Sequence, residues 1–109
     1  MSSHFKIIVP LYNVQEWIKL CLRSIKGQTY RNFECIIIDD ISTDNSVEII
    51  KQEIGNDDRF KLIVNTEKKY ALKNIHHALI DCNPNDEDII VTVDGDDWLA
   101  NKDVLKTLN

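Results

Sequence analysis

Apolar residues occur in short blocks along the chain, and the spacing of the apolar positions changes from one block to the next. Nearly continuous apolar runs at 5–9, 33–38, 60–64 and 88–93 predict four strands, because runs of this length suit strands buried on both faces of a sheet. The segments between them carry apolar residues three and four positions apart, which predicts three helices, the third over roughly 70–82. Alternating strands and helices favour right-handed crossovers. The expected fold class is therefore α/β, with a Rossmann-like parallel sheet and flanking helices.

Residues that break or cap regular structure mark the ends of these elements. Pro10 is expected to end the first strand. Asn13 offers an N-cap for the first helix, with Glu16 at the capping-box position and an apolar face that includes Trp17. Ser, Thr and Asp at 42–44 offer caps for the second helix. A further helix is expected in the tail that starts at residue 101.

Length and composition restrict the class of protein. The chain has 109 residues, 43% of them hydrophobic and 28% charged, which suits one domain over residues 1–109 with a packed core. A formal net charge of -5 argues against a nucleic-acid partner, which would favour a basic surface. The chain contains neither an apolar run long enough to cross a bilayer nor a secretion signal. Cys21, Cys35 and Cys82 lack metal-ligand spacing, and we expect buried thiols in a cytoplasmic protein.

Polar residues gather directly after three of the expected strands. In open α/β sheets, ligands bind outside the carboxyl ends of the strands, where the strand order reverses. Residues far apart in the sequence should therefore meet in one crevice. They are Tyr12 and Asn13 after the first strand, Asp39 and Asp40 at the end of the second, and Asp94, Asp96 and Asp97 after the fourth.

Three motifs carry a resemblance to a known family. VPLYN follows the first strand, QTYRNFECIIIDDISTDNS surrounds the second, and VDGDDWL follows the fourth. Together and in this order they resemble family 2 glycosyltransferases of the GT-A fold. The resemblance implies that the chain forms the first, nucleotide-binding half of that fold, and we expect it to be truncated after the DxD motif. It also implies contacts with the nucleotide from Pro10, Tyr12, Asp39, Asp40, Lys73, Asp94 and Gly95, and with a metal from Asp96, Asp94 and Asp97.

The paired aspartates suggest how a base is selected. An ionised carboxylate only accepts hydrogen bonds, so it favours uracil or thymine, which offer a donor at N3, over cytosine, which does not; guanine stays possible. The resemblance assigns this role to Asp40 and support of the loop and sugar to Asp39. The alternative is that both residues only start the turn at Ser42 and the helix that follows.

Other candidate residues have ordinary structural explanations. Tyr12 is expected to stack on the base, but it could instead pack on Trp17 as a hydrophobic staple. Lys73 stands where many similar proteins carry an arginine near the diphosphate, and it could equally be a solvated helix lysine. His76 and His77 point about 100° apart on a helix, so they are not a metal-binding pair. We expect His77 to be exposed and His76 to flank the core.

The cluster Asp94-Gly95-Asp96-Asp97 resembles the DxD motif of the family. An anionic diphosphate and an acidic crevice repel each other unless a divalent cation lies between them, and hard oxygen ligands suit Mn²⁺ or Mg²⁺. Asp96 is the expected main ligand, with Asp94 and Asp97 on ribose or metal-bound water. Gly95 is expected to allow a sharp turn. An EF-hand is excluded, because its longer spacing and later glutamate are missing.

Two positions depart from the family pattern at the rim of the expected nucleotide site. Ile41 stands where a glycine is usual after the Asp pair. Lys68 and Lys69 replace a flexible, glycine-rich stretch before the third helix. Both changes affect the expected shape of the loops around the base.

The expected function is metal-dependent transfer of a sugar from a nucleotide diphosphate sugar to an unknown acceptor with inversion, and the expected donor is a UDP-sugar. The general base lies further downstream in similar proteins, so we assign none and expect this chain alone to be inactive. Uncovered sheet edges or helix faces would let it form homo-oligomers. The alternatives are a non-catalytic nucleotide-binding module, a nucleotidyltransferase-like domain, although no glycine-rich phosphate loop follows the first strand, and a receiver-like signalling domain.

Overall fold

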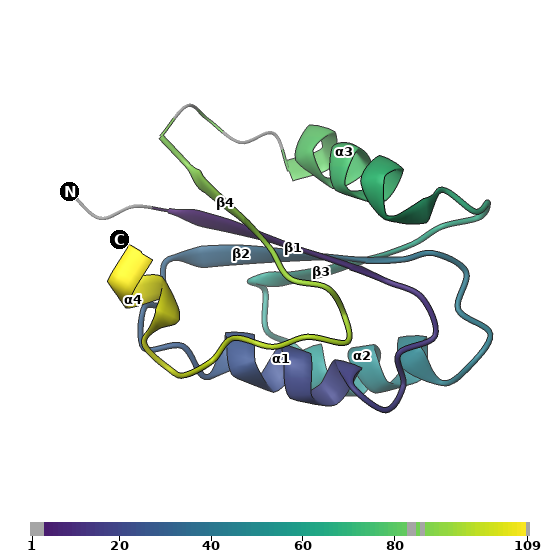
Figure 1. The fold of residues 1–109 in the computed structure, drawn as a ribbon, viewed down its shortest axis with the longest axis horizontal. Coiled ribbons are helices and arrows are strands. Elements are labelled where there is room, and N and C mark those ends of the chain that lie inside the picture. Colours follow the sequence, from purple (N-terminus) through teal and green to yellow (C-terminus); the bar gives the residue numbers. More distant parts are fainter. Residues whose placement is uncertain (1–3, 83–84, 86, 109) are drawn as a thin grey trace.

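The computed structural model describes residues 4–82, 85 and 87–108. Within them, four parallel strands form one sheet in the order β3-β2-β1-β4. Helices cover both of its faces, with α1 and α2 on one and α3 on the other (Figure 1). This arrangement confirms the α/β fold class. The strands are β1 (Phe5–Leu11), β2 (Phe33–Asp39), β3 (Phe60–Val64) and β4 (Ile89–Thr92), and the helices are α1 (Ile18–Lys26), α2 (Ser46–Ile54), α3 (Tyr70–Cys82) and α4 (Val104–Leu108).

The central strands divide the core into two layers. Alternate residues of β1 point to opposite faces, as the period of a strand requires. Phe5, Ile7 and Val9 belong to the cluster that α1 and α2 cover. Ile8 packs with Ala78 of α3 on the other face. Both faces of β1 and β2 are therefore dry, which explains why their sequences are almost continuously apolar.

Pro10 does not end the first strand, contrary to the prediction. β1 continues to Leu11, with Pro10 opposite Ile38 of β2. The pairing of β1 with β4 stops earlier, at Ile8 and Thr92. The Pro10 carbonyl then accepts the Gly95 N–H at 3.1 Å. The edge of Pro10 that faces β4 lies beyond the last residue pair of the β1–β4 ladder. The N–H that proline lacks therefore costs the sheet no hydrogen bond.

The predicted cap of the first helix is also wrong. α1 begins at Ile18, five residues after Asn13, and Trp17 occupies the N-cap position without a side-chain bond. Asn13 instead joins two loops: its Oδ1 accepts the Thr43 N–H at 2.7 Å, and its own N–H donates to the Ser42 hydroxyl at 2.9 Å. Its φ of 49° is left-handed, which asparagine tolerates better than most residues.

Three further predictions on individual side chains have mixed outcomes. Trp17 is 47% exposed and lies outside the core, contrary to the pattern. Cys21 and Cys35 are buried thiols as predicted, whereas the side chain of Cys82 lies outside the described residues. The burial of His76 and His77 is the reverse of the prediction.

His76 is exposed and His77 is half-buried. The reason is that Asn74 and Ala78 form the buried face of α3, and His77 borders this face whereas His76 points away from it. The buried Nδ1 of His77 has no hydrogen-bond partner among the described residues.

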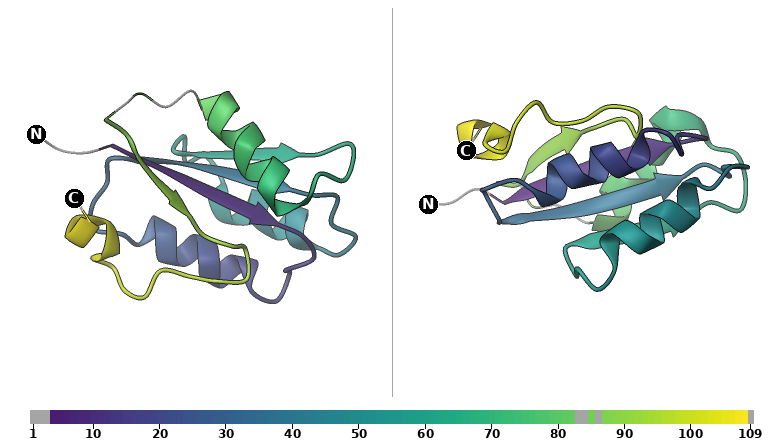
Figure 2. Two further views of the ribbon diagram at one scale, coloured as in Figure 1. Left: turned by 45° about the horizontal axis from the view of Figure 1, so that its top comes forward. Right: turned by 90° about the horizontal axis from the view of Figure 1, so that it is seen from below.

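After β4 the chain runs back along α1 to the short helix α4, as Figures 1 and 2 show. Buried Gln28 holds this return segment: its Nε2 donates to the Asn101 carbonyl at 2.6 Å, and its Oε1 accepts the Leu105 N–H at 3.0 Å. α4 confirms the helix predicted in the tail. None of the helices within residues 4–82 and 87–108 is long and apolar enough to cross a bilayer.

Candidate functional site

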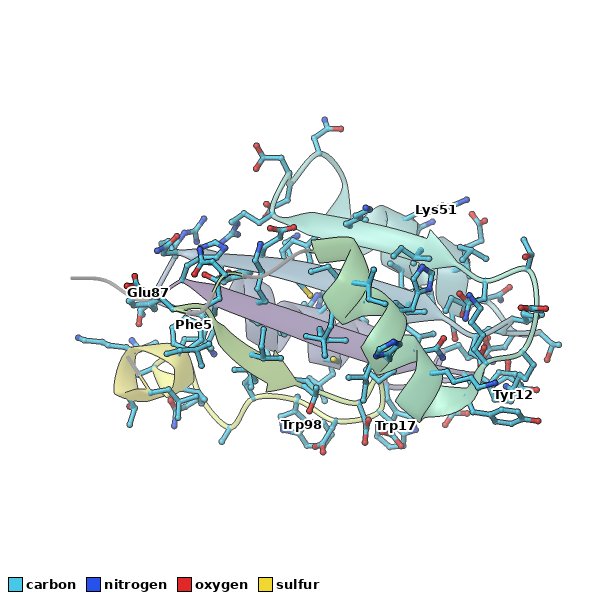
Figure 3. The ribbon with its side chains drawn as sticks, turned by 90° about the horizontal axis from the view of Figure 1, so that it is seen from above. Phe5, Tyr12, Trp17, Lys51, Glu87 and Trp98 are labelled. Atoms are coloured by element: carbon cyan, nitrogen blue, oxygen red, sulfur yellow. The ribbon has the colours of Figure 1, made fainter. Side chains whose placement is uncertain are left out.

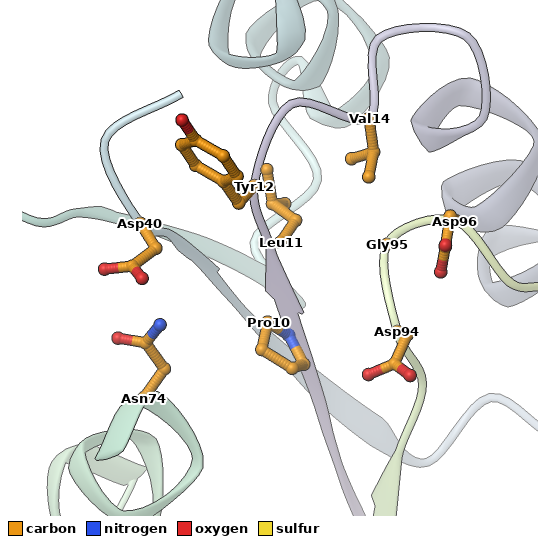
Figure 4. Close-up of a pocket in the computed structure, with 9 residues that line it drawn as sticks. All are labelled: Pro10, Leu11, Tyr12, Val14, Asp40, Asn74, Asp94, Gly95 and Asp96. Carbon is orange, nitrogen blue, oxygen red and sulfur yellow. The ribbon is translucent and has the colours of Figure 1, made fainter. Parts of the chain in front are cut away.

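A pocket of about 290 Å³ opens at the carboxyl end of the sheet, beside the point where the strand order reverses. Figure 4 shows its two sides, with Asp40 and Asn74 facing each other on one and the Asp94–Asp96 loop on the other. Figure 3 shows Tyr12 at this end of the molecule and Phe5 at the opposite end. The predicted convergence of the three strand ends is thus present. The lining residues are Pro10, Leu11, Tyr12, Val14, Asp40, Asn74, Asp94, Gly95 and Asp96.

Asp40 is the most heavily bonded carboxylate of the pocket. Its Oδ1 accepts the Lys69 N–H at 2.8 Å and the Asn65 side-chain amide at 3.1 Å. Its Oδ2 accepts the Tyr70 N–H at 2.7 Å. Asn65 also donates to the Asn74 side chain at 2.7 Å. Asp40 therefore fixes the loop that leads from β3 into α3, and it places a negative charge at the N-terminus of that helix.

These bonds keep Asp40 ionised. Only 3% of the residue is exposed, and burial by itself would raise the pKa of its carboxyl. The hydrogen bonds from Lys69, Asn65 and Tyr70, together with the charge of Lys68, outweigh burial and lower this pKa from 3.8 to about 2. The carboxylate of Asp40 is therefore ionised at neutral pH, and hydrogen bonds from Lys69, Asn65 and Tyr70 fix its orientation in the pocket.

Tyr12 carries a cation on the face of its ring. The Lys68 ammonium lies 3.0 Å from the centroid of the Tyr12 ring and 3.5 Å from Oδ2 of Asp40. Tyr12 is 47% exposed. The staple with Trp17 loses its basis, because it required a helix cap at Asn13, which is not the cap.

Asp39 and Ile41 shape the other side of Asp40. The Oδ2 of Asp39 accepts the Ser42 N–H at 3.1 Å, which holds the turn after β2. Its Oδ1 is buried without a hydrogen-bond partner in the described part of the chain. Ile41 has a φ of 63°, a left-handed conformation that is strained for a β-branched residue. This strain explains why a glycine would suit the position.

The loop after β4 is built by close packing. A Cβ added to Gly95 would lie 2.6 Å from Leu11 Cβ and 3.0 Å from Val14 Cγ2. The expected sharp turn is present, since the Asp97 N–H donates to the Asp94 carbonyl at 2.9 Å, but the φ of Gly95 is not left-handed. The close contact with the end of β1 is therefore what excludes a side chain at this position. Asp94 and Asp96, on either side of it, are exposed and line the pocket. Burial, together with the charges of Asp97, Asp96 and Asp94, raises the pKa of the Cys21 thiol behind this loop to about 12.

Comparison with known proteins decides the family. Residues 6–109 match the family described as Glycosyl transferase family 2. The chain belongs to this glycosyltransferase family. It is 37% identical, over 105 residues, to a glycosyltransferase from Haemophilus influenzae, and the match covers 94% of this chain and 40% of that protein.

Solved structures confirm the GT-A likeness of the fold. TarS from S. aureus in complex with UDP-GlcNAc superposes with a TM-score of 0.83 at 29% identity, over 96% of this chain and 30% of that one. The mannosyltransferase PcManGT from Pyrobaculum calidifontis, in complex with GDP-Man and Mn²⁺, also gives 0.83, at 26% identity over 96% of this chain and 31% of that one. This family 2 chain thus spans less than half the length of these proteins.

The donor groups of this glycosyltransferase pocket fit a divalent cation only in part. No group of three or more His, Cys, Asp or Glu side chains among the described residues is arranged to hold a metal. Asp94 and Asp96 reach the pocket, whereas Asp97 is not among its lining residues and its Oδ1 accepts the Trp98 N–H at 3.1 Å. Mg²⁺ commonly takes one or two carboxylates, with substrate phosphates and water completing its shell. Asp94 and Asp96 fit that role.

Sequence reasoning missed Asn65 and Asn74, which are 7% and 1% exposed. Both had a signal: Asn65 directly follows the third strand, and Asn74 lies within the apolar face of the third helix. Lys73, the residue predicted from the resemblance, is exposed and does not line the pocket. Asp39 does not line the pocket either, because it is buried, with 1% of the residue exposed.

Proposed function

We propose that the pocket binds the nucleotide of a UDP-sugar and that the protein transfers the sugar to an acceptor with inversion. One observation carries the proposal: three strand ends bring Tyr12, Asp40, Asp94 and Asp96 to one pocket at the reversal of strand order. An aromatic ring and an ionised carboxylate suit a base, and the two exposed carboxylates suit a cation that holds a diphosphate.

The proposed base contacts use the wall at Asp40. Tyr12 would stack on the ring, and the charged carboxylate would accept the N3–H of uracil. A carboxylate has about four acceptor positions, and three of them on Asp40 are taken by Lys69, Asn65 and Tyr70. One position on Oδ2 is left for a base. Asp39 does not line the pocket, so a contact between its buried, unpartnered Oδ1 and the ligand would be made through a bridging water.

The proposed diphosphate contacts use the opposite wall, at Asp94 and Asp96. A bound Mn²⁺ or Mg²⁺ would supply charge neutralisation to the departing diphosphate. Gly95 keeps the two carboxylates close to the end of β1, because no side chain fits between them and Leu11. The Lys73 contact with the diphosphate and a role for Asp97 stay predictions, as do a cytoplasmic location and self-association.

The relatives support this choice without defining the donor sugar. TarS is solved with UDP-GlcNAc and PcManGT with GDP-Man and Mn²⁺. Uracil and guanine both carry an N–H donor that a carboxylate can accept, and cytosine lacks one at N3. We favour uracil. The acceptor and the general base are not assigned.

Calorimetric titration with UDP, with and without Mn²⁺, tests the proposal. We expect UDP to bind more tightly with Mn²⁺, CDP to bind more weakly than UDP, and Asp96→Ala to remove most of the effect of the metal. Asp58→Ala is the matched control, because Asp58 is exposed and lies before β3, at the other end of the sheet. Equal binding of CDP and UDP would refute the base assignment, and metal-independent binding of UDP would refute the role of Asp94 and Asp96.

A further inference from the structure

Lys68 makes four contacts around the place where the proposed base would lie, the longest of them 5.4 Å from its ammonium to the centroid of the Tyr70 ring. Its ammonium is 3.0 Å from the centroid of the Tyr12 ring. The same nitrogen is 3.5 Å from Oδ2 of Asp40 and donates to the Asp40 backbone carbonyl at 3.3 Å. Its side chain is only 32% exposed, which is low for a lysine in a loop. Lys68 is therefore seated in the site and does not extend into solvent.

Two of the three residues that this ammonium contacts, Tyr12 and Asp40, are the groups that a base needs. Stacking requires a face of Tyr12, and the N3–H requires the one acceptor position of Asp40 that Lys69, Asn65 and Tyr70 leave open. That position is on Oδ2, the oxygen nearest to the ammonium. A base whose N3–H reaches this Oδ2 would stack on the face of Tyr12 that the ammonium covers, and a cation and a base cannot share that face because both need contact with the same π surface.

We propose that Lys68 is a built-in competitor of the nucleobase, which must displace its ammonium from Tyr12 and Asp40 in order to bind. This inference rests on the proposed function, because it takes Tyr12 and Asp40 as the base site. It gives a role to one of the two lysines that depart from the family pattern. The competitor lowers the apparent affinity for any base that stacks on Tyr12, whatever is attached to its ribose.

The loop around Lys68 allows such an exchange. The neighbouring N–H groups of Lys69 and Tyr70 are fixed by Asp40, so the backbone holds the lysine near the site. The side chain itself is a flexible four-carbon stem, and its charge is well hydrated once it leaves. Displacement can thus occur by rotation of one side chain while the bonds of Asp40 to the backbone remain.

The test measures binding of uridine and of UDP to the wild-type chain and to Lys68→Met. Methionine keeps the length of the side chain and removes the charge. We expect Lys68→Met to tighten both ligands by a similar factor of roughly 3 to 10, the size expected for loss of a partly desolvated cation–π contact. Lys68→Arg retains a cation and should bind no more tightly than wild type. Lys51→Met, on α2, removes the same charge outside the pocket and should leave binding unchanged.

Uridine carries no phosphate, so it distinguishes competition between Lys68 and the base from binding of the diphosphate by Lys68. If Lys68→Met weakens UDP but not uridine, Lys68 binds the diphosphate and the inference is wrong. Unchanged or weaker binding of both ligands, alongside normal binding by wild type, overturns it as well. Failure of every variant to bind either ligand would instead mean that the proposed function is wrong, and the inference falls with it.

A second measurement examines the contact without any nucleotide. In the free chain, the Tyr12 ring should shift the Lys68 Cε proton resonances upfield, and Tyr12→Leu should remove most of that shift; the Tyr70 ring, 5.4 Å from the ammonium, accounts for any remainder. Saturating uridine should return these resonances to ordinary lysine positions. An ordinary Lys68 resonance in the free wild-type chain would refute the competitor, regardless of how well UDP binds.

Discussion

The two walls of the pocket hold their carboxylates in opposite ways. Asp40 is 3% exposed and its charge is satisfied by hydrogen bonds from the chain. Asp94 and Asp96 are exposed, and their loop is positioned by the packing of Gly95 against Leu11. A charge that the chain satisfies is committed to its own structure, because removing it leaves buried donors unpaired. A charge left in solvent remains available to a ligand.

This difference determines whether the effect of a mutation on binding also reports an effect on folding, on each of the two walls. On the Asp40 wall, recognition and folding depend on the same atoms, so a loss of binding after mutation can be a loss of structure. On the Asp94–Asp96 wall, the charges can be removed with little effect on the fold. The four predictions that follow test this division, beginning with the largest effect.

Asp40→Ala should lower the free energy of unfolding by about 3 kcal/mol, because the Asn65 amide and two backbone N–H groups lose a charged acceptor in a buried place. Asp96→Ala should stay within about 0.5 kcal/mol of wild type, as surface substitutions do. Urea denaturation followed by tryptophan fluorescence measures both. Equal destabilisation by the two substitutions would contradict the contrast between the walls.

Acid should weaken the Asp40 wall specifically. The folded-state pKa of Asp40, about 2, lies below its ordinary value of 3.8. Its contribution to stability is therefore fully present above pH 3.8 and is lost as the pH falls through about 2. The stability difference between wild type and Asp40→Asn should shrink by about 2 kcal/mol over that interval.

The pKa values of Asp44 and Asp57 are also lowered, by hydrogen bonds from Ser46 and from Arg59, so these groups add an acid dependence of their own, and only the comparison with Asp40→Asn isolates Asp40. Denaturation curves at several pH values measure it. A difference that does not depend on pH would show that the hydrogen bonds, and not the charge, carry the effect.

Gly95→Ala should destabilise the chain by about 2 kcal/mol, because its methyl group must displace Leu11 or Val14. The neighbouring substitution Asp94→Ala is the control and should have little effect, since Asp94 is exposed. Thermal and urea unfolding report both. A stable Gly95→Ala variant would mean that this wall is loose, and the contrast with the Asp40 wall would then be one of rigidity as well as charge.

The same contrast explains what the sequence could and could not predict. Strand runs and helix periods depend on local pattern, so the third strand and the third helix were predicted with the bounds that the structure has. The role of Asn13 depends on Ser42 and Thr43, about thirty residues away, which no local capping rule includes. Its position after a strand suggested the nearest helix, and the distant loop was the true partner.

The same distinction between local sequence pattern and contacts over long sequence distances applies to the pocket residues. Tyr12, Asp40 and Asp94 could be predicted because the first two directly follow strands, Asp94 lies two residues after β4, and parallel strands end together. The network of Asp40 with Asn65 and Asn74 needed the packing of α3 against the sheet, and the fit of Gly95 against Leu11 needed the path of the loop after β4. Ile41 lies between these cases: its departure from the family pattern was visible, and its φ of 63° gives the physical reason.

Ile41→Gly is expected to exceed Ile41→Ala in free energy of unfolding by about 1 kcal/mol. The left-handed conformation costs a residue with a Cβ roughly 1–2 kcal/mol, and glycine loses part of that gain through its greater freedom in the unfolded chain. Ile41 is 37% exposed, so both substitutions lose the burial of most of its side chain, and the difference between them reports the strain. The effect is small, but it tests whether strain is stored beside Asp40. Ile41→Ala is the control, because alanine keeps the Cβ and the strain while it removes most of the side chain. If Gly and Ala destabilise the chain equally in urea denaturation, the backbone next to Asp40 is not strained. If the Gly variant is the more stable of the two, the rigid wall of the pocket stores strain that one substitution releases.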